Sequence, residues 1–221
     1  MTIAIIGGTG PEGRGLAVRW CVAGEIVVIG SRLRDRAHAA AEAVRAIVPS
    51  ASVSGETNED AAYAADVIVV SVPYEVVAAT LPPLASAIGG KLVVSVVAAI
   101  DFANGRPKPL LPPGGSIAQE IQELMPTARV TAGFHTLSAE KLADSAAVLN
   151  EDTIICGDDA DARHEIMDLA RKLGGVRPVS GGRLINSIYP ELAVGMLAGL
   201  NRIHRTHTGL RIVGLRHENG A

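Results

Sequence analysis

The stretch Ile3-Ala4-Ile5-Ile6-Gly7-Gly8-Thr9-Gly10-Pro11-Glu12-Gly13 decides the fold of this chain. A short apolar run ends in glycines, and a helix-forming segment follows it directly. Gly8, Gly10 and Gly13 fit the G-x-G-x-x-G spacing of a dinucleotide-binding turn, in which glycines permit the tight turn, the approach of a pyrophosphate and close packing of helix on strand. Free N–H groups at the helix N-terminus favour an anion. The stretch predicts a dinucleotide site rather than a purely structural turn.

The composition predicts what surrounds this turn. The 221 residues are enough for one sizeable core. Hydrophobic residues make up 48% of the chain and aromatic residues only 3%, so we expect a core of Ala, Val, Ile and Leu. Such a core suits parallel strands covered by helices. We therefore predict the α/β fold class, as a Rossmann-like, doubly wound, mostly parallel sheet with a small C-terminal helical cap.

Several other classes of protein are disfavoured. The formal net charge of −3 predicts no binding to nucleic acid. Cys21 and Cys156 lie far apart and indicate neither a disulfide framework nor a metal site, and His204 and His207 lack an acidic or cysteine partner. The apolar stretch 67–88 is broken by prolines, so we expect no membrane span. With an N-terminal strand in place of a signal peptide, we expect a cytoplasmic protein.

The end of the second predicted strand indicates which dinucleotide binds. NAD-specific folds usually place Asp or Glu there, to bind the ribose 2′-hydroxyl. This chain has Gly30-Ser31-Arg32, with Arg34 and Arg36 just beyond and Asp35 as the acid nearby. Guanidinium and hydroxyl groups attract a 2′-phosphate that a carboxylate would repel. The pattern favours NADP over NAD, and the alternative is an ordinary solvated helix start rich in arginine.

Periodicity and turn residues predict the remaining elements. Asn58 is the expected N-cap of a helix and Ser116 that of another, and residues 101–113 are expected to form a loop over the cofactor cleft. Strands are predicted at 3–7, 26–29, 51–54, 67–72, 91–97, 129–133, 153–156 and 176–179, and helices at 13–23, 37–47, 58–66, 75–88, 116–124, 160–173 and 184–205.

The last predicted helix is apolar on more than one side, although a surface helix needs a single apolar stripe. Its apolar residues are Leu184, Ile185, Ile188, Leu192, Val194, Met196, Leu197 and Leu200. We expect this helix to contribute to the interface of a homodimer. The alternative is a helix fully buried within a monomer.

Reactive side chains are scarce at the predicted strand ends. The strand at 67–72 runs into Pro73-Tyr74-Glu75, near the point where a doubly wound sheet binds ligands, so Tyr74 is either a cofactor contact or an edge of the core. His135 is expected at the cleft floor, where it orients an acceptor or caps a loop. No evident side chain would protonate a carbonyl substrate. Hydride transfer between two redox cofactors needs mainly positioning and exclusion of water.

These features together resemble the F420-dependent NADP oxidoreductases. The resemblance covers nearly the whole chain in the right order. It rests on the motifs Gly7–Gly13, Gly30-Ser31-Arg32 with Arg36, Val72-Pro73-Tyr74-Glu75, Phe134-His135-Thr136-Leu137-Ser138-Ala139, Cys156-Gly157-Asp158-Asp159, Gly181–Asn186, Glu191, Asn201-Arg202 and His207–Arg211.

The resemblance implies hydride transfer between NADP(H) and the deazaflavin coenzyme F420. It implies an NADP-binding Rossmann-like domain at 1–180 and a C-terminal helix and tail at 181–221 that complete the acceptor pocket. The glycine turn contributes Gly8, Thr9, Gly10, Pro11, Glu12 and Gly13, and the NADP phosphates are held by Thr9, Ser31, Arg32 and Arg36. The ring pocket is lined by Ser71, Val72, Pro73, Tyr74, Val97, Ala98, Ala99, His135, Gly209 and Leu210. No residue is assigned a catalytic role.

The loop after the fifth strand departs from the family pattern. Family members usually carry a proline there, often as Asn-Pro, whereas this chain has Val96-Val97-Ala98-Ala99-Ile100. The loop faces the redox rings, so the acceptor is less firmly indicated than the donor. The cytosolic reductase domain of the six-transmembrane metalloreductases is similar in design and passes electrons to a flavin. A reductase of a flavin or an imine-like molecule, or a non-catalytic NADP-binding protein, therefore stays as an alternative.

Overall fold

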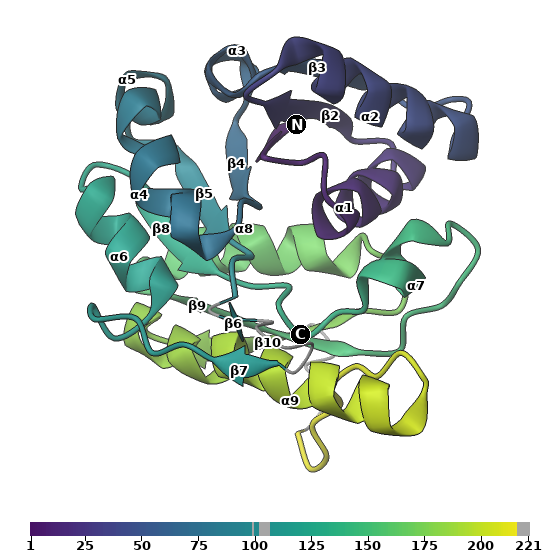
Figure 1. Cartoon of the computed structure of the whole chain (residues 1–221), viewed down its shortest axis with the longest axis vertical. Helices are drawn as coiled ribbons and strands as arrows, with labels where there is room; N and C mark the ends of the chain where they lie inside the picture. Colours follow the sequence, from purple (N-terminus) through teal and green to yellow (C-terminus); the bar gives the residue numbers. More distant parts are fainter. Residues whose placement is uncertain (99, 102–106, 216–221) are drawn as a thin grey trace.

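The computed structural model describes residues 1–98, 100–101 and 107–215 (Figure 1). An eight-stranded sheet has the order β10-β9-β8-β5-β4-β1-β2-β3. Its strands are β1 (Thr2–Ile6), β2 (Ile26–Ser31), β3 (Val53–Thr57), β4 (Val67–Val70), β5 (Leu92–Ser95), β8 (Arg129–Ala132), β9 (Asp152–Gly157) and β10 (Arg177–Gly182).

Strand direction confirms the predicted mostly parallel sheet. The strands from β3 to β8 in the sheet order are all parallel, whereas β9 runs antiparallel to β8 and β10 runs parallel to β9. The chain order reverses between β1 and β4, so the carboxyl ends of these two neighbouring strands form the switch point where such sheets bind ligands.

Helices cover both faces of the sheet (Figure 1). They are α1 (Pro11–Val22), α2 (Arg34–Ile47), α3 (Asn58–Ala64), α4 (Val77–Thr80), α5 (Ala85–Ile88), α6 (Ile117–Leu124), α7 (Ala139–Ala143), α8 (Ala160–Arg171) and α9 (Ile188–His204). One core lies under α1, α2 and α8 and the other under α3 to α6. The side chains of β1 alternate between the two faces of the sheet, so Ile3 and Ile5 lie in the first core and Ala4 and Ile6 lie in the second.

Local structure differs from the predictions at several places. The helix expected over 75–88 is broken into short pieces, α4 and α5, separated by the 3₁₀ turn Pro82–Leu84, because the paired prolines lack an N–H to donate. The loop expected at 101–113 contains regular structure in its described part, since β6 (Ile100–Asp101) pairs antiparallel with β7 (Lys108–Pro109), and residues 102–106 lie outside the described residues. The short helix α7 follows β8 at a position where no helix was expected.

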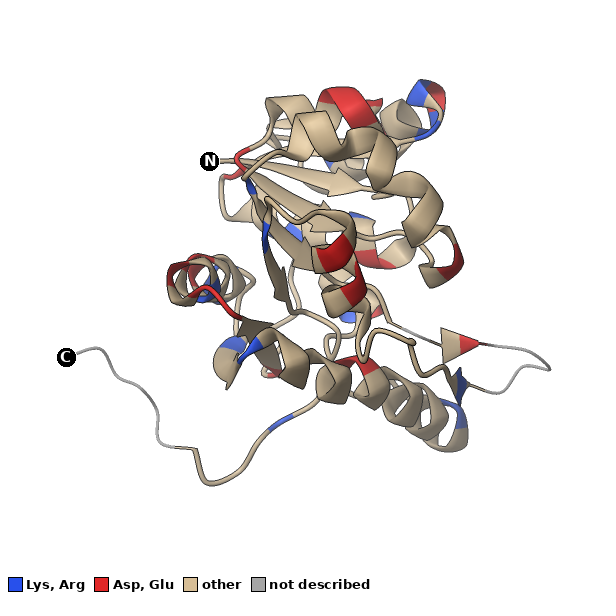
Figure 2. Ribbon diagram, turned by 90° about the vertical axis from the view of Figure 1, so that its left-hand side faces the viewer, with Lys and Arg blue, Asp and Glu red and all other residues tan. Residues whose placement is uncertain are grey.

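Helix α9 packs against the rest of the molecule on one side. Glu191 is fully buried and accepts hydrogen bonds from the N–H groups of Ile117 (2.8 Å) and Ala118 (3.2 Å), at the start of α6. The other side is open, since Tyr189 is 71% exposed and Met196 is 54% exposed. Figure 2 shows α9 as a largely uncharged helix. In the described part of the chain, no helix has the length and apolar character to cross a bilayer.

Candidate active site

The glycine turn joins β1 to α1 at the switch point. Gly7 has a φ of +72° and a Cβ there would lie 2.4 Å from Val72 Cγ1, so only glycine fits. A Cβ on Gly13 would lie 2.7 Å from the Cα of Gly8, which explains how closely α1 approaches the turn. A Cβ on Gly10 would meet nothing within 4 Å. The turn is therefore tightly packed at Gly7 and Gly13 and open at Gly10, where a pyrophosphate needs room to approach.

Asn58 holds this turn in place, a role that the sequence did not indicate. Its Oδ1 accepts a hydrogen bond from the N–H of Gly7 at 3.2 Å, and the residue is 8% exposed. Thr57, not Asn58, is the N-cap of α3, because its Oγ1 accepts from the N–H of Asp60. A polar residue directly after the end of β3 was the available signal, since parallel strands end at the same edge of the sheet.

A cavity of about 500 Å³ lies beside the turn, and we call it the arginine cavity. Thr9, Ser31, Arg32 and Arg36 line it. Ser31 is buried and its Oγ accepts from the N–H of Leu33 at 3.3 Å, which leaves the hydroxyl hydrogen free to donate. Within the described residues neither Arg32 nor Arg36 has an ion-pair partner. The cavity therefore offers two unneutralised cations and a hydroxyl to an anion.

Arg34 lies in the same basic run but is already paired. Its guanidinium contacts Glu56 at 2.8 Å and also Asp60, and it is absent from the lining of the arginine cavity. Because α2 begins at Arg34, three residues earlier than expected, Arg34 and Arg36 are two positions apart in a helix and lie on different faces of it. The structure thus separates Arg32 and Arg36 from Arg34.

A second cavity, of about 550 Å³, adjoins the first, and we call it the central cavity. The two share Gly7, Thr9, Val72 and Pro73. Its lining brings together residues predicted from three separate strand ends, namely Gly10, Pro11, Glu12, Ser71, Val72, Pro73, Tyr74, Val97 and Ala98. The hydroxyl of Tyr74 donates to Glu120 Oε2 at 3.0 Å, so its ring forms a wall and its polar end lies toward α6. Ala99 lies outside the described residues.

A third cavity, of about 350 Å³, lies under α9, and we call it the helix cavity. It shares Glu12, Val96, Ala98 and Val194 with the central cavity, so the three cavities adjoin one another in a row. His135 and Leu137 line one side. The wall opposite includes Leu197, Ala198 and Asn201 from α9, with His207 and Thr208 from the tail. The sequence did not indicate these wall residues, because helix periodicity does not show which face meets a cavity.

His135 is held in the helix cavity by a strained residue before it. Phe134 has a φ of +68°, and its N–H donates to Thr153 Oγ1 at 2.7 Å. His135 is 7% exposed, and neither ring nitrogen has a hydrogen-bond partner among the described residues. Burial lowers the pKa of His135 to about 4, with a smaller opposing effect from the Val97 backbone. The imidazole is therefore neutral at pH 7, with one donor and one acceptor nitrogen.

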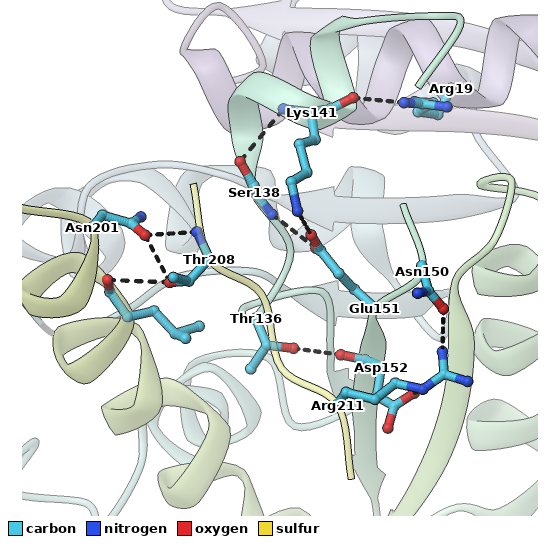
Figure 3. Close-up of polar contacts among 11 residues, drawn as sticks. Arg19, Thr136, Ser138, Lys141, Asn150, Glu151, Asp152, Asn201, Thr208 and Arg211 are labelled. Carbon is cyan, nitrogen blue, oxygen red and sulfur yellow. Dashed lines mark hydrogen bonds and ion pairs between the residues drawn. The ribbon is translucent and has the colours of Figure 1, made fainter. Parts of the chain in front are cut away.

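The C-terminal tail closes the helix cavity through Thr208. Figure 3 shows Asn201 and Thr208 linked, with the Thr208 N–H donating to Asn201 Oδ1 at 2.6 Å. Gly209 and Leu210 do not line the cavity. The Leu210 carbonyl accepts from the N–H of Asp152 at 2.7 Å, and a Cβ on Gly209 would lie 2.2 Å from Glu151 Cδ. The tail is thus fastened to β9 immediately beyond the residues that face the cavity.

No group of three or more His, Cys, Asp or Glu side chains suited to a metal occurs in the ranges that the structure describes. Cys21 and Cys156 are free and buried. The open glycine turn, the free arginines and the mostly apolar central and helix cavities suit a dinucleotide and a second flat ligand instead. The fold and the glycine turn at its switch point define a dinucleotide-binding protein of the Rossmann class.

Comparison with known proteins identifies the family. The family model described as "NADP oxidoreductase coenzyme F420-dependent" matches residues 2–99. The chain is 36% identical over 222 residues to the F420-dependent NADP reductase of Methanocaldococcus jannaschii, an alignment that covers 97% of this chain and 99% of that protein. The chain belongs to the family of F420-dependent NADP reductases, as its motifs predicted.

Two further matches extend the comparison. A crystal structure of a putative F420-dependent NADP reductase from Arthrobacter sp. FB24 superposes with a TM-score of 0.83 at 25% identity, and covers 96% of this chain and 99% of that one. The rat protein named metalloreductase STEAP3 is 31% identical over 181 residues, which are 81% of this chain and 34% of that protein. The expected likeness to the metalloreductases is therefore confirmed.

Proposed function

We propose that this protein transfers a hydride between NADP(H) and coenzyme F420. The observation that carries the proposal is the row of adjoining cavities from the free Arg32 and Arg36 to the α9 wall. A row of this kind accommodates two cofactors end to end, with their redox rings meeting where the central and helix cavities share residues. The named activity of the relatives supports the same reading.

The donor end would be held by the residues around the glycine turn. Arg32 and Arg36, with the Ser31 hydroxyl and Thr9, would bind the 2′-phosphate, and the free N–H groups of the first turn of α1 would face the pyrophosphate. The open space at Gly10 leaves room for this approach.

The acceptor end would lie between the Rossmann-like part and the C-terminal segment. We propose that residues 1–180 bind NADP and that residues 181–221 complete the acceptor pocket. This division is supported by Val194 and Leu197 of α9, and by Thr208 of the tail, which line the helix cavity beside His135. The mostly apolar walls would exclude water from the rings.

The bound cofactors would supply the redox chemistry, since NADPH gives a hydride to the deazaflavin, which also takes one proton from solvent. The protein's part is to hold the two reacting carbons about 3–3.5 Å apart and to keep water out. No strongly acidic side chain is needed for this transfer. The direction of the reaction follows the ratio of the cofactor pools and the pH.

A panel of acceptors tests this function. Purified protein with NADPH is given F420, FMN, FAD or a cyclic imine, and oxidation of NADPH is followed by absorbance. We expect turnover with F420 and a preference for NADPH over NADH. Turnover of another acceptor alone would overturn the proposal, and binding of NADPH without any turnover would indicate a non-catalytic protein.

A flavin or imine-like acceptor is the second candidate, and one feature of the chain favours it. The segment Val96-Val97-Ala98 takes the place of the proline that the family usually carries, and Val97 and Ala98 both line the central cavity. Small side chains there permit rings of other outlines. Turnover of a flavin or an imine in the same panel would establish this candidate.

We also propose that the protein is a cytoplasmic homodimer. The open side of α9 supports the dimer, because Tyr189, Met196 and Ile203, with Ile185 just before the helix, are each more than half exposed and a solvated helix face is seldom so apolar. The two buried free cysteines are consistent with a reducing compartment.

A further inference from the structure

Glu12 is a polar side chain left without a partner at the junction of two cavities. It is the second residue of α1, and it lines both the central and the helix cavity. Glu12 as a whole is partly exposed, but its Oε1 is buried and has no hydrogen-bond partner among the described residues. Buried polar atoms in folded proteins are nearly always paired, so this oxygen indicates a ligand group that the protein is built to receive.

The surroundings of Glu12 favour its neutral form. The neighbouring carboxylate, Glu151, is paired with Lys141 at 2.6 Å and accepts from the N–H of Ser138, so the Lys141 cation is already engaged (Figure 3). Burial, with a smaller contribution from Glu151, raises the pKa of Glu12 to about 8. At pH 7 the side chain is then a carboxylic acid, with one O–H donor and one carbonyl acceptor side by side.

His135 provides a second, independent sign of a ligand. The imidazole is buried and neutral, its nitrogens make no well-aligned hydrogen bond among the described residues beyond a weak contact with the Val97 backbone, and His135 lines the same helix cavity as Glu12. Val96, Val194 and Leu197 make up apolar parts of the wall. The lining also includes the paired Glu140 and His207, but the apolar walls together with Glu12 and His135 suit a flat ring that bears polar atoms on its edge.

We propose that the carboxyl group of Glu12 binds the amide or imide edge of a redox ring at the junction of the two cavities. A carboxylic acid pairs with adjacent C=O and N–H groups through two hydrogen bonds, one in each direction. The carboxamide of nicotinamide and the pyrimidinedione edge of a deazaflavin both present that pattern. The inference rests on the proposed function for the identity of the ring, but the geometry of Glu12 does not depend on it.

Binding of each oxidised cofactor alone tests the proposal. Dissociation constants for NADP⁺ and for F420 are measured by calorimetry on wild type, Glu12→Gln and Glu12→Leu. Gln keeps a donor beside an acceptor, so we expect both constants to stay within about threefold of wild type. Leu removes both groups, and we expect at least about tenfold weaker binding of one cofactor. The cofactor whose binding weakens is the one whose ring edge contacts Glu12.

Glu59 offers a matched control. It is the second residue of α3, as Glu12 is of α1, but it is exposed and lines none of the three cavities. Glu59→Leu should leave both dissociation constants unchanged, and thermal melting checks that every variant is folded. Glu12→Met replaces Glu12→Leu if the latter fails to fold.

Three outcomes would overturn the inference. The first is unchanged binding of both cofactors by Glu12→Leu. The second is equal loss in Glu12→Gln and Glu12→Leu, since that result would indicate an ionised carboxylate. The third comes from infrared difference spectra of wild type at pH 7, if they lack a protonated-acid band that shifts on binding and disappears in Glu12→Gln. A wild type that binds NADP⁺ but reduces no F420 would refute the proposed function. The titrations of NADP⁺ into the Glu12 variants would still test the role of Glu12.

Discussion

The rings of Trp20 and Phe134 meet edge to face, with centroids 5.6 Å apart and planes at 89°. Trp20 lies on α1 and its Nε1 donates to the Leu169 carbonyl of α8. Phe134 has a positive φ, and it is followed directly by His135. The pair therefore ties the helix that follows the glycine turn to the residue that lines the helix cavity.

Truncating Phe134 should destabilise the protein strongly. Phe134→Ala removes a fully buried ring and leaves a cavity against Trp20, so we expect the free energy of unfolding to fall by about 3–5 kcal/mol in urea titration. Tyr63→Ala is the control, because that side chain is 55% exposed, and it should cost less than about 1 kcal/mol. A loss of similar size in both variants would contradict the packing role of Phe134.

Removing Arg32 should weaken binding of NADPH selectively. Loss of a charged hydrogen bond to phosphate costs about 1.5–3 kcal/mol, so Arg32→Ala should raise the dissociation constant for NADPH about 10–150-fold. NADH, which lacks the 2′-phosphate, should be affected little. Arg34→Ala is the control, since Arg34 is already paired with Glu56 and Asp60. Equal losses for NADPH and NADH would refute the assignment.

A large side chain at the proposed site of the redox rings should block turnover and leave the affinity for NADPH nearly unchanged. Ala98 lines both the central and the helix cavity, whereas the proposed phosphate contacts lie in the arginine cavity, which Ala98 does not line. Ala98→Phe should therefore keep nearly normal affinity for NADPH and lose at least about 100-fold in turnover, the scale of a ~1 Å misplacement. Calorimetry and steady-state kinetics measure the two effects. Undiminished turnover would place the acceptor elsewhere.

Glu191 should make stability depend on pH. Burial raises the pKa of this side chain to about 7, against the opposing hydrogen bonds from Ile117 and Ala118. The folded state therefore binds a proton more tightly than the unfolded state, whose carboxyl has an ordinary pKa near 4.5. The resulting stabilisation is complete below about pH 4.5 and is lost as the pH rises toward about 7.

Glu191→Gln isolates this effect. At low pH the variant should be about as stable as wild type, because the protonated acid and the amide each offer one acceptor oxygen beside one donor. As the pH rises from about 5 to about 7, wild type should lose stability relative to the variant, as measured by urea unfolding at each pH. A wild type that loses no stability relative to the variant over this range would contradict the assignment.

Charges on the open side of α9 should separate the proposed dimer. The double variant Tyr189→Glu/Met196→Glu places two carboxylates on the face assigned to the interface, and light scattering at micromolar concentration should report a monomer. Val22→Glu is the control, because Val22 is 53% exposed on α1, close to the 54% of Met196. A monomeric wild type would refute the dimer.

Local sequence determined much of this protein. The apolar run, glycine turn and helix start of residues 3–13 predict β1 and α1 because strand, turn and capping preferences act between near neighbours. The β-branched run at 67–72 predicts β4 for the same reason. Recurrence of such units predicts the mostly parallel sheet, and the family motifs predict the family. Ser31, Arg32 and Arg36 follow from the place of a strand end in this fold.

Only the tertiary structure decided the details of the site. Arg34 is neutralised by acids from β3 and α3, and Asn58 holds Gly7 across the sheet edge. The tail presents Thr208 to the helix cavity, while Gly209 and Leu210 are fastened to β9. Glu12 meets His135 in one cavity although 123 positions separate them in the chain. Each of these outcomes depends on contacts between residues far apart in the sequence, which propensity and periodicity do not encode.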